Sequence, residues 1–260
     1  MCSDVVLSHS EGAVLTLTIN RPDKLNALNR AVIEALDAAI DSAAGDDGVR
    51  VVVLRGAGDR AFVAGADISE FADQDAEKAS EMSARGQALF RRIETLGKPV
   101  IAVIDGFALG GGLELAMACT LRIGTDAARV GQPEVNLGLI PGYGGTQRLS
   151  RLAGRAAALE LCLTGEPIAA DRALGLGLLN RLVPREELDE TVSTLAGRLA
   201  EAAPHALRAI IECVNRGADL PLAQALEFET RQFARCFDTD DMREGVTAFL
   251  EKRKPSFKGR

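Results

Sequence analysis

The sequence predicts an α/β core followed by a helical C-terminal portion. Strand-like and helical patterns alternate up to about residue 125, the order that produces crossover units around a mostly parallel sheet. Two strand-like stretches, 49–56 and 100–104, are almost entirely apolar, as strands are when helices cover both faces of their sheet. Past about residue 140 no stretch has a convincing strand pattern, and from Gly154 onward the chain is rich in Ala and Leu.

The chain is expected to open with an antiparallel hairpin. Residues 13–19 alternate with the two-residue period of a half-buried strand, and residues 5–7 can pair with them across a turn at 11–12. Asn29 then caps a predicted helix, which has apolar residues recurring on one face and ends at Gly45.

The remaining elements follow in order along the chain. A polar helix around 76–96 leads into the strand at 100–104. A glycine run, a short apolar helix and a strand at 121–125 come next. Prolines interrupt the helical remainder at 167, 184, 204 and 221.

The composition argues against several classes of protein. A net charge of −7 and a single Tyr with no Trp provide neither a basic surface nor an aromatic ladder for nucleic acid. The five cysteines form no CxxC pair and are typical of reduced thiols in a cytosolic protein. The most apolar segment, 99–119, contains Asp105, Glu114 and four glycines, and the N-terminus lacks a transit-peptide pattern. We therefore expect a cytoplasmic protein that binds neither nucleic acid nor membrane.

Familiar cofactor and nucleophile motifs fail in their context. Residues 56–61 match G-x-G-x-x-A after a strand, but no helix opens there and the acidic residue of a dinucleotide site is missing. The glycines at 175 and 177 lack a preceding strand. His9 and His205 are the only histidines, which leaves almost no material for a triad or a metal site. We expect both to be ordinary surface or helix residues, and we expect neither a metal nor a cofactor.

Two glycine-bearing segments predict a site at the carboxyl ends of strands. Residues 62–68 follow the strand at 49–56, and residues 106–114 follow the strand at 100–104. If a helix begins in the second segment, its first N–H groups are unpartnered and can stabilise negative charge on a carbonyl oxygen. Glu114 lies three residues after Gly111, on the same helical face, and leans back toward the helix start.

Structural explanations stand beside these functional ones. The glycines could serve tight helix–sheet packing, and Glu114 could pair with an arginine such as Arg122. A carboxylate inside LGGGLELAMA is costly to bury unless it is paired or used. Glu134, the second candidate, precedes a Pro/Gly-rich loop and could equally be an exposed turn residue. Two carboxylates without a histidine indicate acid/base chemistry on carbon or water rather than acyl transfer.

Several motifs taken together resemble the enoyl-CoA hydratases of the crotonase superfamily, nearly from end to end. The motifs are Asn20-Arg21-Pro22, Leu25-Asn26-Ala27-Leu28, AFVAGADI, DGFALGGGLELAMAC, PEVNLGLIPGYGGTQRL, LTGEPI at 163–168 and AFLEKRKPSF at 248–257. The resemblance implies a spiral of ββα units over 1–195 and a helical trimerisation region over 196–260. It also implies a homo-oligomer, either a trimer or a dimer of trimers.

The resemblance implies roles for individual residues. The N–H groups of Ala66 and Gly111 would form an oxyanion hole for the thioester oxygen of an acyl-CoA. Glu114 and Glu134 would be the catalytic pair, and Gly142 would help to hold the catalytic water. The positions implied to contact CoA are Lys24, Leu25, Ala64, Asp67, Ile68, Phe249 and Lys252. This sequence departs from the family pattern at Leu113, where Cys is common, and at Tyr143, where small residues are common.

The activity implied is that of a hydro-lyase. An enoyl-CoA hydratase adds water across the double bond of a trans-2-enoyl-CoA to give a 3-hydroxyacyl-CoA, in fatty acid β-oxidation or related acyl-CoA catabolism. CoA is then part of the substrate and not a cofactor. A double-bond isomerase, which needs one base, is the first alternative. A non-catalytic acyl-CoA-binding or RNA-binding relative is the second, and the acidic pI and the glutamate pair argue against it.

Overall fold

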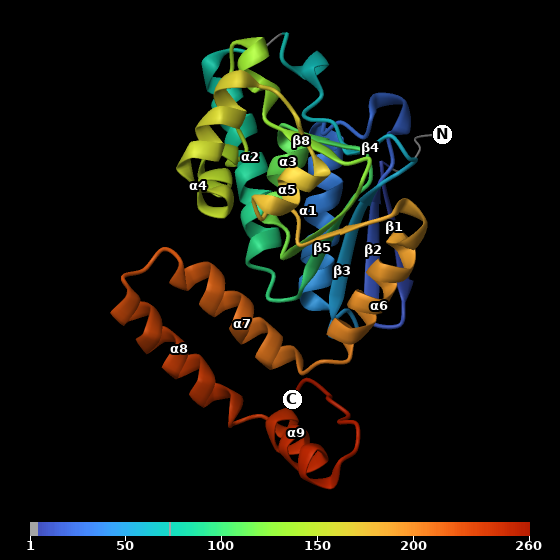
Figure 1. The fold of residues 1–260 in the computed structure, drawn as a ribbon, viewed down its shortest axis with the longest axis vertical. Helices are drawn as coiled ribbons and strands as arrows, with labels where there is room; N and C mark the ends of the chain where they lie inside the picture. The colour runs from blue at the N-terminus through green and yellow to red at the C-terminus, as the bar shows by residue number, and fades with distance from the viewer. Residues whose placement is uncertain (1–4, 73) are drawn as a thin grey trace.

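The computed structural model describes residues 5–72 and 74–260, and it contains two sheets flanked by helices (Figure 1). The larger sheet has the strand order β1-β2-β3-β5-β7-β10, and the smaller has the order β4-β6-β8-β9. The strands are β1 (Val6–Glu11), β2 (Val14–Ile19), β3 (Val51–Gly56), β4 (Ala61–Val63), β5 (Val100–Ile104), β6 (Phe107–Leu109), β7 (Leu121–Thr125), β8 (Arg129–Gly131), β9 (Ile168–Ala169) and β10 (Arg181–Val183). The α-helices are α1 (Arg30–Gly45), α2 (Ala76–Glu94), α3 (Gly111–Ala118), α4 (Gly145–Thr164), α5 (Ala170–Gly175), α6 (Leu188–Ala200), α7 (Pro204–Gly217), α8 (Leu222–Cys236) and α9 (Asp240–Glu251).

Three consecutive pairs of strands follow one pattern, in which each pair places its first strand in the larger sheet and its second in the smaller sheet. β3 and β4, β5 and β6, and β7 and β8 each contribute one strand to either sheet, and the strands of successive pairs run parallel to one another within each sheet. A helix follows each pair, α2 after the first, α3 after the second and α4 after the third. The result is the spiral of ββα units that the resemblance implied.

The predicted amino-terminal elements are confirmed. β1 pairs with β2 in antiparallel register from Val6↔Ile19 to Glu11↔Val14. The Asn29 side chain accepts a hydrogen bond from the Val32 N–H at 3.0 Å, which caps α1, and α1 ends at Gly45 as expected. Local capping chemistry and periodicity therefore determine this part of the fold.

The apolar strand β3 is covered on both faces, as its composition predicted. Val52 and Leu54 belong to the apolar cluster that includes residues of α1, α2 and α3. Val51 and Val53 belong to a second cluster with residues of α6. All four are at most 3% exposed, so each position from 51 to 54 contributes to a core.

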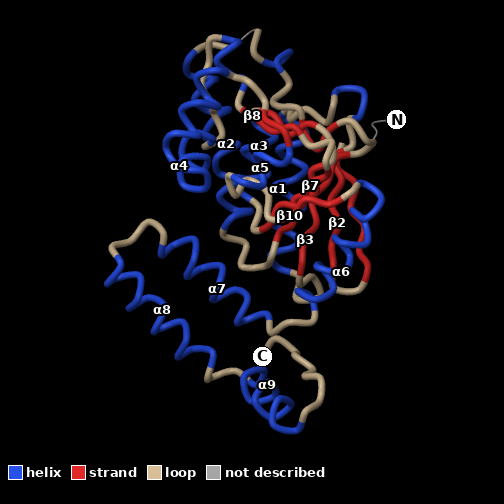
Figure 2. Tube along the Cα trace, viewed as in Figure 1, coloured by secondary structure: helices blue, strands red, loops and turns tan. Residues whose placement is uncertain are grey.

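The prediction that no strand lies beyond about residue 140 is wrong. β9 pairs antiparallel with β8, and β10 extends the larger sheet beside β7 (Figure 2). These strands have two and three residues, too few for any periodicity to be visible in the sequence. The helical pattern also begins earlier than Gly154. α4 starts at Gly145, and Gly154 interrupts it with φ 81°.

The last helices extend away from the sheets. α7 and α8 form an antiparallel hairpin beside the body of the molecule, with α9 beyond them (Figure 1). The implied boundary at 195/196 falls inside α6, which packs on the larger sheet. None of the helices in the described part of the chain has the length and apolarity needed to cross a membrane.

Candidate active site

The Ala66 N–H is freed by the way the loop after β4 pairs with Leu28. The Leu28 N–H donates to the Gly65 carbonyl at 2.8 Å, and the Leu28 carbonyl accepts from the Asp67 N–H at 2.8 Å. Residues 28 and 66 thus form a parallel bridge, in which the N–H and C=O of residue 66 itself point away from Leu28. Since Ala66 lines a large cavity, its N–H is a candidate donor to a ligand.

The glycine run before Glu114 both packs tightly and presents a donor. Gly111 is the first residue of α3, so its N–H has no acceptor within the helix. Gly110 has φ 49°, a region that glycine enters without a Cβ penalty. A Cβ at Gly112 would lie 2.0 Å from the Val63 carbonyl oxygen, so α3 can approach β4 this closely only with glycine there. The packing explanation and the functional one are therefore compatible.

Glu114 is buried, and main-chain donors hold its carboxylate. Its side chain is 1% exposed, and Oε1 accepts from the N–H groups of Tyr143 at 2.7 Å and Gly145 at 2.6 Å. Gly145 is the first residue of α4, so the positive end of that helix faces the carboxylate. Arg122 is not the partner, because its guanidinium donates to the carbonyls of Leu178 and Cys119.

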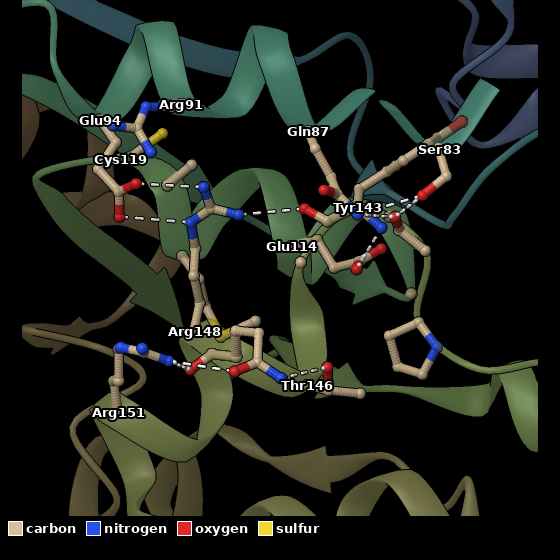
Figure 3. Close-up of a pocket in the computed structure, with 18 of the residues that line it drawn as sticks. Ser83, Gln87, Arg91, Glu94, Glu114, Cys119, Tyr143, Thr146, Arg148 and Arg151 are labelled. Carbon is tan, nitrogen blue, oxygen red and sulfur yellow. Dashed lines mark hydrogen bonds and ion pairs between the residues drawn. The ribbon is translucent and has the colours of Figure 1, made fainter. Parts of the chain in front are cut away.

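The loop that binds Glu114 is itself fixed by polar side chains (Figure 3). Ser83 Oγ and Gln87 Nε2, both on α2, donate to the Gly142 carbonyl at 2.5 and 2.9 Å. Because a trans peptide is planar with C=O and N–H on opposite sides, these bonds orient the Tyr143 N–H toward Glu114. Arg148 donates to the Tyr143 carbonyl at 3.1 Å and forms an ion pair with Glu94 at 3.1 Å.

Glu134 lies opposite the start of α3. Its Oε1 is 2.7 Å from the position that a Cβ at Gly110 would occupy, so glycine at 110 makes room for the carboxylate. The buried Gln132 amide, oriented with its nitrogen toward Glu134, donates to both carboxylate oxygens at 3.0 and 3.1 Å. Glu134 is half-buried at the cavity wall, which argues against the simple exposed turn residue.

Both carboxyl groups have raised pKa values. Burial, with the nearby Glu134 second, raises the pKa of Glu114 to about 7, while the hydrogen bonds from Gly145 and Tyr143 lower it. Burial raises the pKa of Glu134 to about 7 as well. Groups that titrate near neutral pH suit proton transfer in both directions.

One cavity of about 1890 Å³ connects these groups. That volume exceeds the usual range for a drug-sized ligand, so it can accept a long substrate. The sequence-predicted site residues that line it are Ala64, Ala66, Ile68, Gly111, Glu114, Glu134 and Gly142. Glycines from the segments 106–112 and 138–145 and the two carboxylates therefore meet at one site.

The remaining predicted CoA positions divide into two groups. The Leu25 carbonyl accepts from the Ala64 N–H at 3.0 Å, which places the exposed Lys24 and the half-buried Leu25 beside the cavity rim. The Asp67 carboxylate is engaged by Arg21 at 2.8 Å and by Ser69, so it stabilises the loop.

Phe249 and Lys252 form the second group, and the structure does not bring them to this cavity. Phe249 lies on α9 with 83% of its surface exposed, and Lys252 follows at the end of that helix. α9 lies at the far end of the molecule from α3 (Figure 1).

A family model described as enoyl-CoA hydratase/isomerase matches residues 9–260. The chain belongs to the enoyl-CoA hydratase/isomerase family. It is 46% identical to a short-chain-enoyl-CoA hydratase of Clostridium acetobutylicum, with 98% of each chain covered. It is 44% identical to a crotonyl-CoA hydratase of Syntrophomonas wolfei, with 99% of each covered. A crystal structure of an enoyl-CoA hydratase from Bacillus anthracis has a TM-score of 0.95 at 37% identity, covering 98% of this chain and 100% of that one.

Membership of this family confirms the fold class and the resemblance seen in the motifs. The sequence did not single out Ser83, Gln87, Gln132 or Arg148, the side chains that hold the site in place. Arg148 lies inside the recognised motif around Glu134 and Gln132 directly precedes it, which was the available signal. Ser83 and Gln87 lie in an ordinary polar helix pattern that carries no such signal. His9 and His205 are exposed and lie in a strand and a helix, as expected.

Proposed function

We propose that this family member is an enoyl-CoA hydratase, which converts a trans-2-enoyl-CoA and water into a 3-hydroxyacyl-CoA. One observation carries the proposal: two carboxyl groups with pKa values near 7 line a cavity beside the N–H groups of Ala66 and Gly111. Relatives named short-chain-enoyl-CoA and crotonyl-CoA hydratase support the same reaction and suggest crotonyl-CoA as the first substrate to test.

The main-chain donors polarise the substrate. The thioester oxygen accepts hydrogen bonds from the Ala66 and Gly111 N–H groups, and these bonds strengthen as negative charge develops on that oxygen. C3 thereby becomes electrophilic. Both donors belong to the backbone and are fixed before the substrate arrives, so little reorganisation is needed at the moment of reaction.

The two carboxyl groups divide the proton transfers. Ionised Glu114 accepts a proton from water as the water oxygen bonds to C3, and protonated Glu134 donates its proton to C2. The C2–C3 π pair becomes the new C2–H bond by way of the enolate, so one water is consumed and nothing is oxidised or reduced. Proton exchange through the next water restores the starting state, with Gly142 helping to hold that water.

Substitution of either glutamate tests the assignment. Glu114→Gln and Glu134→Gln keep the side-chain shape but lose proton transfer, which is worth about 10²- to 10⁴-fold in rate. The rate is measured as the loss of absorbance of the conjugated thioester of crotonyl-CoA. Glu186→Gln, an exposed change outside the cavity lining, is the matched control and should behave like the wild type. Wild-type turnover in either active-site variant would sink the proposal.

A double-bond isomerase would use the same oxyanion hole with a single base. The raised pKa of the second carboxyl group, Glu134, favours hydration, because water addition requires both a base and an acid. Supplying a 3-enoyl-CoA and a 2-enoyl-CoA in parallel separates the reactions. If the 3-enoyl-CoA is turned over faster than the 2-enoyl-CoA, the protein is an isomerase and the proposed hydratase activity is wrong.

We also propose that the chain assembles with itself, as a trimer or a dimer of trimers. Large apolar side chains on α8 and α9 are exposed in the single chain, among them Leu222, Phe233, Phe249 and Leu250 at 66–83%. Exposed apolar groups of this size are typical of a protein–protein interface. An assembly of this kind could bring Phe249 and Lys252 of one subunit to the CoA of another.

A cytoplasmic location is proposed on the state of the thiols. Cys119, Cys162, Cys213 and Cys236 are free in the described part of the chain, as is typical of a reducing compartment.

A further inference from the structure

Tyr143 carries the bulkiest side chain of the Pro/Gly-rich loop at 141–145, and its ring is turned inward. Only 6% of the residue is exposed, yet it lines the same cavity as Glu114 (Figure 3). Its N–H donates to Glu114, so the base of the side chain is fixed next to the reacting carboxylate. The ring therefore occupies space immediately beside the reaction centre.

The ring is wedged between α2 and α3. Its Cδ1 lies 2.3 Å from the position of a Cβ at Gly86, so glycine at this point of α2 is what admits the ring. On the other side, Cδ2 lies 3.3 Å from the position of a Cβ at Gly111, the residue that supplies the second oxyanion donor. Phe90 contacts the ring edge-on, with centroids 5.5 Å apart and an interplanar angle of 78°.

These contacts hold the ring in one place. Ser83 and Gln87 fix the peptide that precedes it, and Phe90 and Gly86 fix its position against α2. Burial raises the pKa of the Tyr143 hydroxyl to about 12, so the side chain stays uncharged at physiological pH. A fixed neutral ring acts as a wall and not as a gate.

The placement of the substrate then decides what this wall does. In the proposed hydration, the thioester oxygen binds the Gly111 N–H and C3 faces the water activated by Glu114. C4 and later carbons would then leave the centre on the side away from the thioester. We propose that the Tyr143 ring closes the acyl pocket between α2 and α3 and restricts the enzyme to short-chain enoyl-CoA substrates. This inference rests on the proposed hydration and assigns its substrate class.

Chain-length profiles of ring variants test the inference. The kcat/KM for trans-2-enoyl-CoA thioesters of four, six, eight and ten carbons is measured for wild type, Tyr143→Ala and Tyr143→Phe. In the wild type, kcat/KM should fall roughly tenfold or more between four and eight carbons. Tyr143→Ala should raise the eight-to-four ratio roughly tenfold or more, whereas Tyr143→Phe, which keeps the ring, should keep the wild-type ratio.

A second pair of variants shows whether the ring acts through its fit against α2. Gly86→Ala places a Cβ against the ring and should lower the rate with the four-carbon substrate, because the ring is pushed into the pocket. The same change in a Tyr143→Ala background should cost little, since the clashing ring is gone. If Gly86→Ala has equal effects in both backgrounds, the ring does not act through its contact with α2.

The outcomes separate the two proposals. If the wild type does not hydrate crotonyl-CoA, the proposed function fails. If it does, and Tyr143→Ala leaves the eight-to-four ratio unchanged, only the role of Tyr143 fails. Should Tyr143→Ala not fold, Tyr143→Leu removes the ring with a smaller cavity, and its ratio decides in the same way.

Discussion

Glu114 takes opposing influences from its surroundings. Burial and Glu134 favour its neutral form, while two main-chain N–H groups and the start of α4 favour its ionised form. The balance lies near neutral pH. The charge state of the base is thus set by where the backbone places the side chain, and no arginine or lysine is bonded directly to it among the described residues.

The pH dependence of hydration should be bell-shaped. Both carboxyls have pKa values near 7, and the reaction needs one ionised and one protonated. Activity should fall at low pH as the base becomes protonated, and at high pH as the acid loses its proton. The measurement is kcat for crotonyl-CoA across pH 5 to 9. A kcat that stays constant from pH 5 to pH 9 would contradict the assigned proton transfers.

The raised pKa of Glu114 should also make the free energy of unfolding depend on pH. A carboxyl whose folded pKa is raised contributes stability below its unfolded pKa and loses it as pH rises through the folded value. For Glu114 the window runs from 4.5 to about 7, worth on the order of 3 kcal/mol. Relative to wild type, Glu114→Gln should therefore gain unfolding free energy in urea as pH rises through this window. A difference that stays constant with pH, as expected for Glu186→Gln, would contradict it.

At the residue scale, the sequence pointed to the two carboxyl groups that the structure brings to one cavity, but not to the groups that support them. Glu114 stands out because a carboxylate inside an apolar helix is costly, and Glu134 because it lies in a recognisable motif. The Tyr143 and Gly145 N–H groups that hold Glu114 lie about thirty residues away, and no side chain marks them. Main-chain donors cannot be read from residue identity, only from the fold.

Among the elements, α3 packs closely against β4. Its first residue carries one of the proposed oxyanion donors, and Gly112 lies directly against the last residue of β4. The same β4 leads into the loop that carries Ala66. Any displacement of α3 from β4 therefore changes the distance between the two donors.

A methyl group at Gly112 tests this contact. Gly112→Ala puts a Cβ 2.0 Å from a backbone oxygen, so it should destabilise the fold by about 1–3 kcal/mol and lower kcat for crotonyl-CoA. Gly197→Ala in α6 is the control, because nothing lies within 4 Å of its Cβ and alanine favours a helix interior. It should leave activity intact and raise the thermal midpoint slightly. Equal activity in the two variants would show that the close packing of α3 against β4 is not needed for activity.

Long periodic elements were predictable and short ones were not. α1, α2, β3 and β5 show clear periodicity or apolar runs, and each appears where the sequence placed it. β4, β6 and β8 have three residues each and lie beside glycines, so no period can emerge. Together with the two-residue β9, these strands make the smaller sheet, which is why pattern alone did not reach the ββα spiral.

At the scale of the whole molecule, the helices after α6 bury little of their apolar surface within one chain. Leu222, Leu226 and Phe233 on α8 and Phe237 directly after it are all more than half exposed. Such surface favours association through burial of apolar area. The exposed apolar surface at this end supports the proposed assembly.

Charged substitutions on α8 and α9 should dissociate the assembly. Burying a large apolar side chain is worth about 1.5–3 kcal/mol, so the double variant Phe233→Asp/Leu250→Asp should weaken association roughly 10²-fold or more. Sedimentation at several concentrations measures the mass. Leu163→Asp, exposed on α4 outside these helices, serves as the control and should keep the wild-type mass. A monomeric wild type would overturn the assembly.

The parallel pairing of β4 with β6 has a consequence for the distance between the proposed oxyanion donors. Ala66 follows one of these strands and Gly111 the other, and neighbouring strands in a sheet lie about 4.8 Å apart. The hydrogen bonds between the two strands thus set the separation of the two N–H groups that we propose to bind the thioester oxygen. Side chains on either loop can change with substrate while that span stays constant, so one scaffold can serve many acyl groups without rebuilding its reaction centre.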